Sequence, residues 1–202
     1  MDYDDAVIEF LSQKDNFRLA VEVSEHLEQA KARIQVGFWT ACRKRLEERL
    51  KVSKWAKTWQ ATIDPDEDLG RKDAGVYLIP SDVDEDDDDP SAFTYCLKRW
   101  FSNKVILYPG AALGYYGLWQ EHRSKEVERF AAALKRHGFN ESSKETMGWL
   151  KWRTYETVNE FLLAINERAE ELAENGVEVL WDTFEKTAAL AEKATAALRS
   201  GK

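Results

Sequence analysis

Apolar residues recur every three or four positions along the first part of the chain, which is the spacing of one face of an α-helix. Residues 3–11 predict a short amphipathic helix, and a second helix of roughly eight turns begins near Phe17. Gly37 interrupts the second helix at a cost of ~1 kcal/mol relative to alanine, so we expect a bend or a close contact with another backbone there. The apolar stripe of this helix consists of Val23, Leu27, Ala30, Ile34, Phe38, Cys42 and Leu46.

From Trp55 onward the pattern changes to runs of β-branched and aromatic residues, bounded by glycine, proline, asparagine and aspartate. Such runs are typical of strands, and we interpret them as strands of one antiparallel sheet. The predicted strands cover residues 58–63, 75–80, 93–97, 104–108, 114–119 and, later in the chain, 147–153.

Helical spacing returns in the second half of the chain. Ser124 is the expected N-cap of one helix, and Gly138 followed by Phe139 is typical of a left-handed C-terminal cap. Residues 155–175 predict another helix, which Gly176 is expected to end, and residues 183–199 predict the last one.

These elements predict an α+β fold in which an antiparallel β-sheet packs with a long N-terminal helix and C-terminal helices. No repeat or flexible linker divides the chain, so we expect a single domain over residues 1–202. Its N-terminal part is helical (1–50), its middle is mostly β-sheet with one inserted helix (55–153), and its last part is helical (154–202).

Composition supports a buried core, because 44% of the residues are hydrophobic and 12% are aromatic. The eight tryptophans indicate either a tryptophan-rich core or an aromatic binding surface. Cys42 and Cys96 have no second cysteine or histidine at ligand spacing, so both are interpreted as reduced core thiols. No signal peptide or apolar run of ~20 residues is present, which favours a cytoplasmic protein without membrane contact.

The negative charge is local. Residues 64–89 carry twelve acidic and two basic residues, whereas the whole chain has a net charge of −8. A run of like charges in a loop is usually a solvated segment. The alternative is a partner-binding surface made by Asp84, Glu85, Asp86, Asp87, Asp88 and Asp89.

No metal or cofactor site is expected. Asp64, Asp66 and Asp68 have the alternation of a calcium loop, but Leu69 and Gly75 stand where that loop needs glycine and glutamate. The three histidines, His26, His122 and His137, are scattered, and each is expected at the surface or at a helix cap.

A basic segment with adjacent tryptophans suggests nucleic-acid binding. Seven basic residues lie within fifteen positions, against two glutamates. Basic charge beside aromatic rings can follow a phosphate backbone and stack bases, whereas the plainer alternative is a helix end whose dipole favours cations. The candidate nucleic-acid-binding residues are Arg43, Lys44, Arg45, Arg49, Lys51, Lys54, Trp55, Lys57 and Trp59.

Three segments resemble a known family: Ile8-Glu9-Phe10-Leu11 through Gly37–Cys42, then Arg45–Leu50, and the later strand Trp149–Trp152. The pattern resembles the region after the catalytic core in a family of bacterial and phage PD-(D/E)XK superfamily proteins. In that family a helix containing Phe-Leu, a helix ending in Phe-Trp and a short antiparallel sheet follow the nuclease. The active site does not carry over, because no lysine of this chain has an acidic residue two positions before it.

The sequence therefore favours a non-enzymatic recognition module of a DNA-processing, phage or defence-related protein that binds nucleic acid or a protein partner. The alternative is a small acidic inhibitor or adaptor whose Asp84–Asp89 loop engages a basic surface of its partner. The pattern leaves the oligomeric state open.

Overall fold

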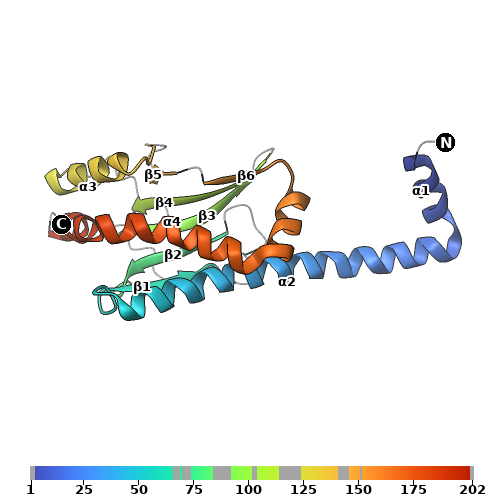
Figure 1. Cartoon of the computed structure of the whole chain (residues 1–202), viewed down its shortest axis with the longest axis horizontal. Helices are drawn as coiled ribbons and strands as arrows, with labels where there is room; N and C mark the ends of the chain where they lie inside the picture. The colour runs from blue at the N-terminus through green and yellow to red at the C-terminus, as the bar shows by residue number, and fades with distance from the viewer. Residues whose placement is uncertain are drawn as a thin grey trace.

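The computed structural model describes residues 3–65, 69, 74–83, 92–101, 104–113, 124–140, 146–150 and 152–200. A six-stranded antiparallel sheet and the helices packed on it form the body of the molecule (Figure 1). Helix α2 (Lys14–Val52) lies over the first two strands, and α4 (Val158–Ser200) crosses the next two beside α2. Helix α3 (Lys125–Arg136) packs against α4. The predicted α+β class is confirmed.

The strands follow one another in chain order across the sheet, β1-β2-β3-β4-β5, and β6 also pairs with β4. Four of the predicted strands are confirmed, and the predicted strand 114–119 falls outside the residues that the structure describes. The run 147–153 is two short strands, which both pair with β4. The strands are β1 (Trp59–Ile63), β2 (Gly75–Pro80), β3 (Phe93–Phe101), β4 (Val105–Leu113), β5 (Thr146–Trp149) and β6 (Arg153–Tyr155).

The N-terminal helices extend away from the body. Helix α1 (Tyr3–Ser12) ends at an elbow, where the side-chain amide of Asn16 donates to the Phe10 carbonyl at 2.9 Å. Helix α2 is 39 residues long and continues through Gly37. The expected close backbone contact at Gly37 is wrong, because nothing lies within 4 Å of the position that a Cβ would occupy there.

The last two predicted helices form one long element, α4, whose break lies at Arg168 (φ −138°, ψ 37°) and not at Gly176. Gly176 is buried inside the helix, where an added Cβ would lie 2.9 Å from Leu97 Cδ2 and 3.0 Å from Trp152 Cζ3. Tertiary packing overrides the low helix propensity of glycine here, because the missing side chain allows α4 to approach the sheet closely.

Both predicted caps of α3 are confirmed. The Ser124 side chain accepts a hydrogen bond from the Val127 backbone N–H at 3.2 Å. At the other end Gly138 has φ 84°, Phe139 N donates to the Leu134 carbonyl, and Phe139 is buried. This is the left-handed cap with its hydrophobic contact that the sequence indicated.

An aromatic cluster joins the helices to the sheet. Phe184 of α4 lies with its ring centroid 5.0 Å from that of Trp59 and 5.3 Å from that of Tyr95, while Trp55 and Trp181 lie 5.9 and 5.2 Å away. The Tyr95 hydroxyl and the Thr187 hydroxyl form a buried hydrogen bond of 2.7 Å. Four tryptophans of the described residues, at positions 39, 55, 59 and 181, are thus part of the core.

A buried arginine lies where α2 leaves the body. Arg99 of β3 is fully buried, bonds the Gln35 side chain of α2, and donates to the Leu69 carbonyl at 3.2 Å. Its guanidinium carbon also lies 5.5 Å from the ring centroid of Phe161 in α4. Since burying a charge is costly unless it is hydrogen-bonded, these contacts fix β3, α2 and α4 relative to one another.

The two cysteines are free, buried thiols, as the sequence predicted. Cys42 packs in the main core, and Cys96 belongs to a smaller cluster with Tyr77 and Ile79. Burial raises the pKa of the Cys96 thiol from 9.0 to about 11, and the nearby Asp64 raises it further while Lys98 lowers it. Burial also raises the pKa of Cys42 and of the Tyr95 hydroxyl.

Two glycine substitutions should have opposite effects on stability. Gly37→Ala should raise the free energy of unfolding by about 0.5–1 kcal/mol, because alanine favours the helix and its Cβ meets no neighbour. Gly176→Ala should lower it by about 1–3 kcal/mol, because the Cβ overpacks against Leu97 and Trp152. Urea unfolding of both variants measures this contrast, and an equal gain from both would contradict the close packing of α4.

The Cys96 thiol should make stability depend on pH in the alkaline range. The folded chain keeps a proton that the unfolded chain loses, so the contribution is complete below pH 9 and is lost as the pH rises toward 11. Cys96→Ala should therefore unfold with a shallower decline, by up to about 1.4 kcal/mol per pH unit between those values. Cys42 and Tyr95 are present in both proteins, so their contributions cancel, and identical slopes would refute the assignment.

Candidate functional site

Two arginines of the basic segment form ion pairs within the protein, where α2 packs on α4. Arg45 pairs with Glu170 at 2.6 Å and with Glu174 at 3.2 Å, and Arg49 pairs with Glu174 at 2.6 Å. The side chains of these arginines are 22% and 29% exposed. Both guanidinium groups therefore connect two helices, and the arrangement places counter-charges where a phosphate would otherwise bind.

The two tryptophans of this segment are core residues. Trp59 is only 2% exposed, and its indole N–H donates to Glu192 of α4 at 3.0 Å. Trp55 is buried against Phe184. A ring whose faces are covered by protein cannot stack on a base, so the structure does not present Trp55 or Trp59 as a stacking platform.

The remaining basic residues lie on the surface. Arg43 pairs with Glu47 of its own helix at 2.8 Å. The four lysines, Lys44, Lys51, Lys54 and Lys57, are exposed, and the Lys54 ammonium lies 4.7 Å from the Trp55 ring centroid. Counting Glu170 and Glu174 with the segment lowers its local charge from +5 to +3. What is left is a modest basic patch made only of lysines.

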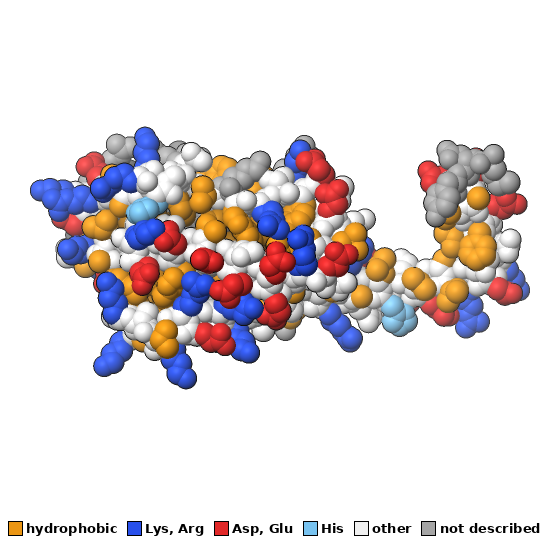
Figure 2. Space-filling model, in the orientation of Figure 1, with side chains coloured by type: hydrophobic (Ala, Val, Ile, Leu, Met, Phe, Trp, Pro, Cys, Tyr) orange, Lys and Arg blue, Asp and Glu red, His pale blue; other side chains and the backbone are white. Residues whose placement is uncertain are grey.

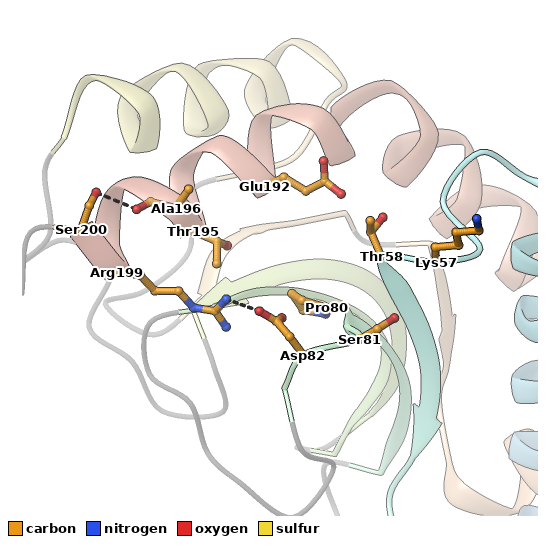
Figure 3. Close-up of a pocket in the computed structure, with 10 residues that line it drawn as sticks. All are labelled: Lys57, Thr58, Pro80, Ser81, Asp82, Glu192, Thr195, Ala196, Arg199 and Ser200. Atoms are coloured by element: carbon orange, nitrogen blue, oxygen red, sulfur yellow. Dashed lines mark hydrogen bonds and ion pairs between the residues drawn. The ribbon is translucent and has the colours of Figure 1, made fainter.

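The acidic run Asp84–Asp89 lies outside the described residues, but the turn before it borders an open pocket of about 830 Å³ (Figure 3). The pocket lies between the C-terminal turns of α4, the turn after β2 and the segment before β1. Its lining residues are Lys57, Thr58, Pro80, Ser81, Asp82, Glu192, Thr195, Ala196, Arg199 and Ser200.

Most polar groups of this pocket already have partners within the protein. Arg199 pairs with Asp82 at 2.5 Å (Figure 3). Glu192 accepts from Trp59, the Thr195 hydroxyl accepts from the Phe93 backbone N–H at 3.1 Å, and the Ser200 hydroxyl donates to the Ala196 carbonyl. The contacts of Glu192, Thr195 and Arg199 attach the end of α4 to the sheet and to the turn after β2, so the polar groups of the pocket have structural roles.

Most of the exposed large apolar side chains lie on a part of the chain that the sequence did not predict to be a binding surface. We call residues 3–33, comprising α1 and the first part of α2, the N-terminal arm. Among residues 4–33 no side chain is buried, and Figure 2 shows hydrophobic side chains along the projecting arm. Of the thirteen exposed large hydrophobic residues in the described part of the chain, nine are here: Val7, Ile8, Phe10, Leu11, Phe17, Leu19, Val21, Val23 and Leu27.

The sequence carried a signal for this surface, but the signal was ambiguous. The stripe Val23, Leu27, Ala30 and Ile34 has the same spacing as Phe38, Cys42 and Leu46, and periodicity alone predicts that all of it is buried. In the structure Phe38, Cys42 and Leu46 are buried in the body and Ile34 packs against the same core, whereas Val23 and Leu27 are exposed. The part of the stripe that is covered depends on how far α4 and the sheet extend along α2, and only the tertiary structure determines this.

We also searched the described residues for metal sites and for membrane-spanning helices. These residues contain no group of three or more histidine, cysteine, aspartate or glutamate side chains that could hold a metal ion. His26 and His137 are exposed, as expected, whereas His122 belongs to a stretch that the structure does not describe. None of the helices described is both long and apolar enough to cross a membrane.

The chain matches no protein-family profile, no curated protein and no solved structure. The resemblance to the accessory region of a PD-(D/E)XK superfamily family therefore remains a prediction.

Substitution should separate the structural arginines from the exposed lysines. Replacing Arg45 and Arg49 by glutamine should lower the free energy of unfolding by about 1 kcal/mol, because partly exposed ion pairs contribute modestly. Replacing Lys44, Lys51, Lys54 and Lys57 by glutamine should leave stability unchanged. Any binding to a short DNA duplex should be weakened, and its salt dependence flattened, only in the lysine variant. Urea unfolding and salt titrations measure both effects, and stable arginine variants would contradict the assignment.

Proposed function

We propose that this protein is a recognition module that binds a protein partner through its N-terminal arm. The observation that carries the proposal is the concentration of nine exposed large hydrophobic side chains on one projecting helical element. Single exposed apolar residues are ordinary on a protein surface, whereas a contiguous patch above a few hundred Å² marks an interaction site.

The stability of the helix in the arm favours a state in which a partner covers its apolar face. Residues 14–33 of α2 form a helix of about 30 Å that lacks packing on the body. Tertiary packing of an amphipathic face supplies most helical stability in proteins, and this part of α2 has no such packing on the body. Val21 and Val23 also have a weak intrinsic helix preference. A partner that buries the apolar face would stabilise this helix and remove Phe10 and Phe17, each about 60% exposed, from water.

Nucleic acid is a second candidate ligand, supported by the exposed lysines Lys44, Lys51, Lys54 and Lys57. We rank it below a protein partner, because Arg45 and Arg49 are paired within the chain and Trp55 and Trp59 are buried. The role of Asp84–Asp89 as an adaptor surface remains a prediction, as does the DNA-processing, phage or defence setting.

Site-specific photocrosslinking in cells that express the protein tests the proposal. Leu19 on the arm and Leu163 on α4 are matched in side chain and in exposure, at 59% and 60%. Each is replaced in turn by the photoreactive amino acid p-benzoylphenylalanine. Illumination should give a discrete crosslinked protein product from position 19 and only background from position 163, as read by immunoblot and mass spectrometry.

Two outcomes would refute a protein-binding role for the arm. One is background crosslinking from both positions, and the other is an equal set of products from both, which would indicate nonspecific encounters of exposed leucines. Thermal unfolding of both substituted proteins provides the control for an intact body.

A further inference from the structure

The apolar surface of the arm continues a stripe that is buried elsewhere on the same helix. Phe38, Cys42 and Leu46 of α2 are buried in the core of the body. Toward the N-terminus the same three- and four-residue spacing continues through Ile34 to Leu27 and Val23, both of which are exposed. At 100° per residue, the apolar positions from Phe17 to Ala30 cover an arc of roughly 200°. This arc exceeds the stripe of about 100° with which a surface helix packs on a core.

The arm has the size of a dimer interface. A standard interface involves about 20–30 residues and ~800 Å² on each partner, and the arm provides 31 residues with nine large apolar side chains that are each 38–63% exposed. Together these side chains expose an apolar surface on the order of several hundred Å². Two arms packed on each other therefore approach the area of a standard interface.

Two ion pairs of α2 lie on the arm, and each is closed within its own chain. Arg18 pairs with Glu22 at 3.2 Å, and Lys31 pairs with Glu28 at 2.7 Å, both within α2. At 100° per residue Glu28 and Lys31 lie within the arc, and Arg18 and Glu22 lie on its polar side. Because each pair is neutral, neither adds a net charge that a second copy would have to neutralise.

The arc also combines large and small side chains, as helix pairing requires. Leu27 and Val23 project beside Ala20, Ser24 and Ala30 on neighbouring turns. Large side chains of one helix can then fill the spaces over small residues of another. A surface that carries both features is complementary to a second copy of itself, as a two-fold symmetric interface demands.

We propose that two copies of this chain form a symmetric dimer through their N-terminal arms. This inference rests on the proposed function, since it specifies the protein partner of the arm. The bodies then lie at the outside of the assembly, each with its lysines Lys44, Lys51, Lys54 and Lys57 at the end of α2 remote from the arm.

Sedimentation equilibrium of the full chain from 1 to 100 μM tests the dimer. The chain of 23.3 kDa should reach about twice this mass. Val23→Glu with Leu27→Glu should raise the dissociation constant about 100-fold or more, because unpaired carboxylates would enter an apolar interface. Leu163→Glu on α4 is the matched control and should leave the dissociation constant unchanged. A dimer that persists in the arm variant would overturn the proposal.

Hydrogen exchange gives a second readout that does not depend on a substituted arm. In the unmodified chain, exchange of the amides in residues 14–33 should slow as the concentration rises, while exchange in the sheet stays constant. A chain that is monomeric at 100 μM, with concentration-independent exchange in the arm, overturns the dimer. If photocrosslinking at position 19 then captures a different protein, the partner-binding function stands without the dimer. Background crosslinking together with a monomer refutes both.

Discussion

The packing of Phe184 against rings from three other parts of the chain is the contact on which the rest of this structure depends. Its neighbours are Trp55 after α2, Trp59 in β1 and Tyr95 in β3, with centroid distances of 5.0–5.9 Å. Aromatic contacts of this kind combine a large buried area with a preferred edge-to-face geometry. They hold α4 across the sheet, which places Gly176 against Leu97 and keeps the helix continuous at that residue.

The same packing determines which charges remain available at the surface. Once α4 lies beside α2, Glu170 and Glu174 meet Arg45 and Arg49, and Glu192 meets the Trp59 indole. The residues that made a nucleic-acid surface plausible in the sequence thus divide into two groups. The tryptophans and these two arginines maintain the fold, whereas the lysines and Arg43, which pairs with Glu47 of its own helix, remain at the surface.

In the arm, by contrast, the apolar stripe of α2 continues beyond the part of the helix that packs on the body. Arg99 and Gln35 fix α2 where it leaves the body, and the helix continues toward the N-terminus with its apolar face open. Burying apolar surface is the main favourable term in association as well as in folding. A helix of this composition therefore carries free energy for binding that the body of the protein does not use.

The sequence by itself determined the local elements, because helix and strand periodicity, the Ser124 cap and the Gly138 turn depend on neighbouring residues. It also predicted the α+β class and the buried thiols. Only the tertiary structure decided that Gly176 lies within a helix, that Trp55 and Trp59 are core residues, and that Val23 and Leu27 are exposed while Phe38 and Leu46 are not. Burial depends on where segments more than a hundred residues apart meet, and periodicity records only that a face is apolar, not whether the chain provides anything to cover it.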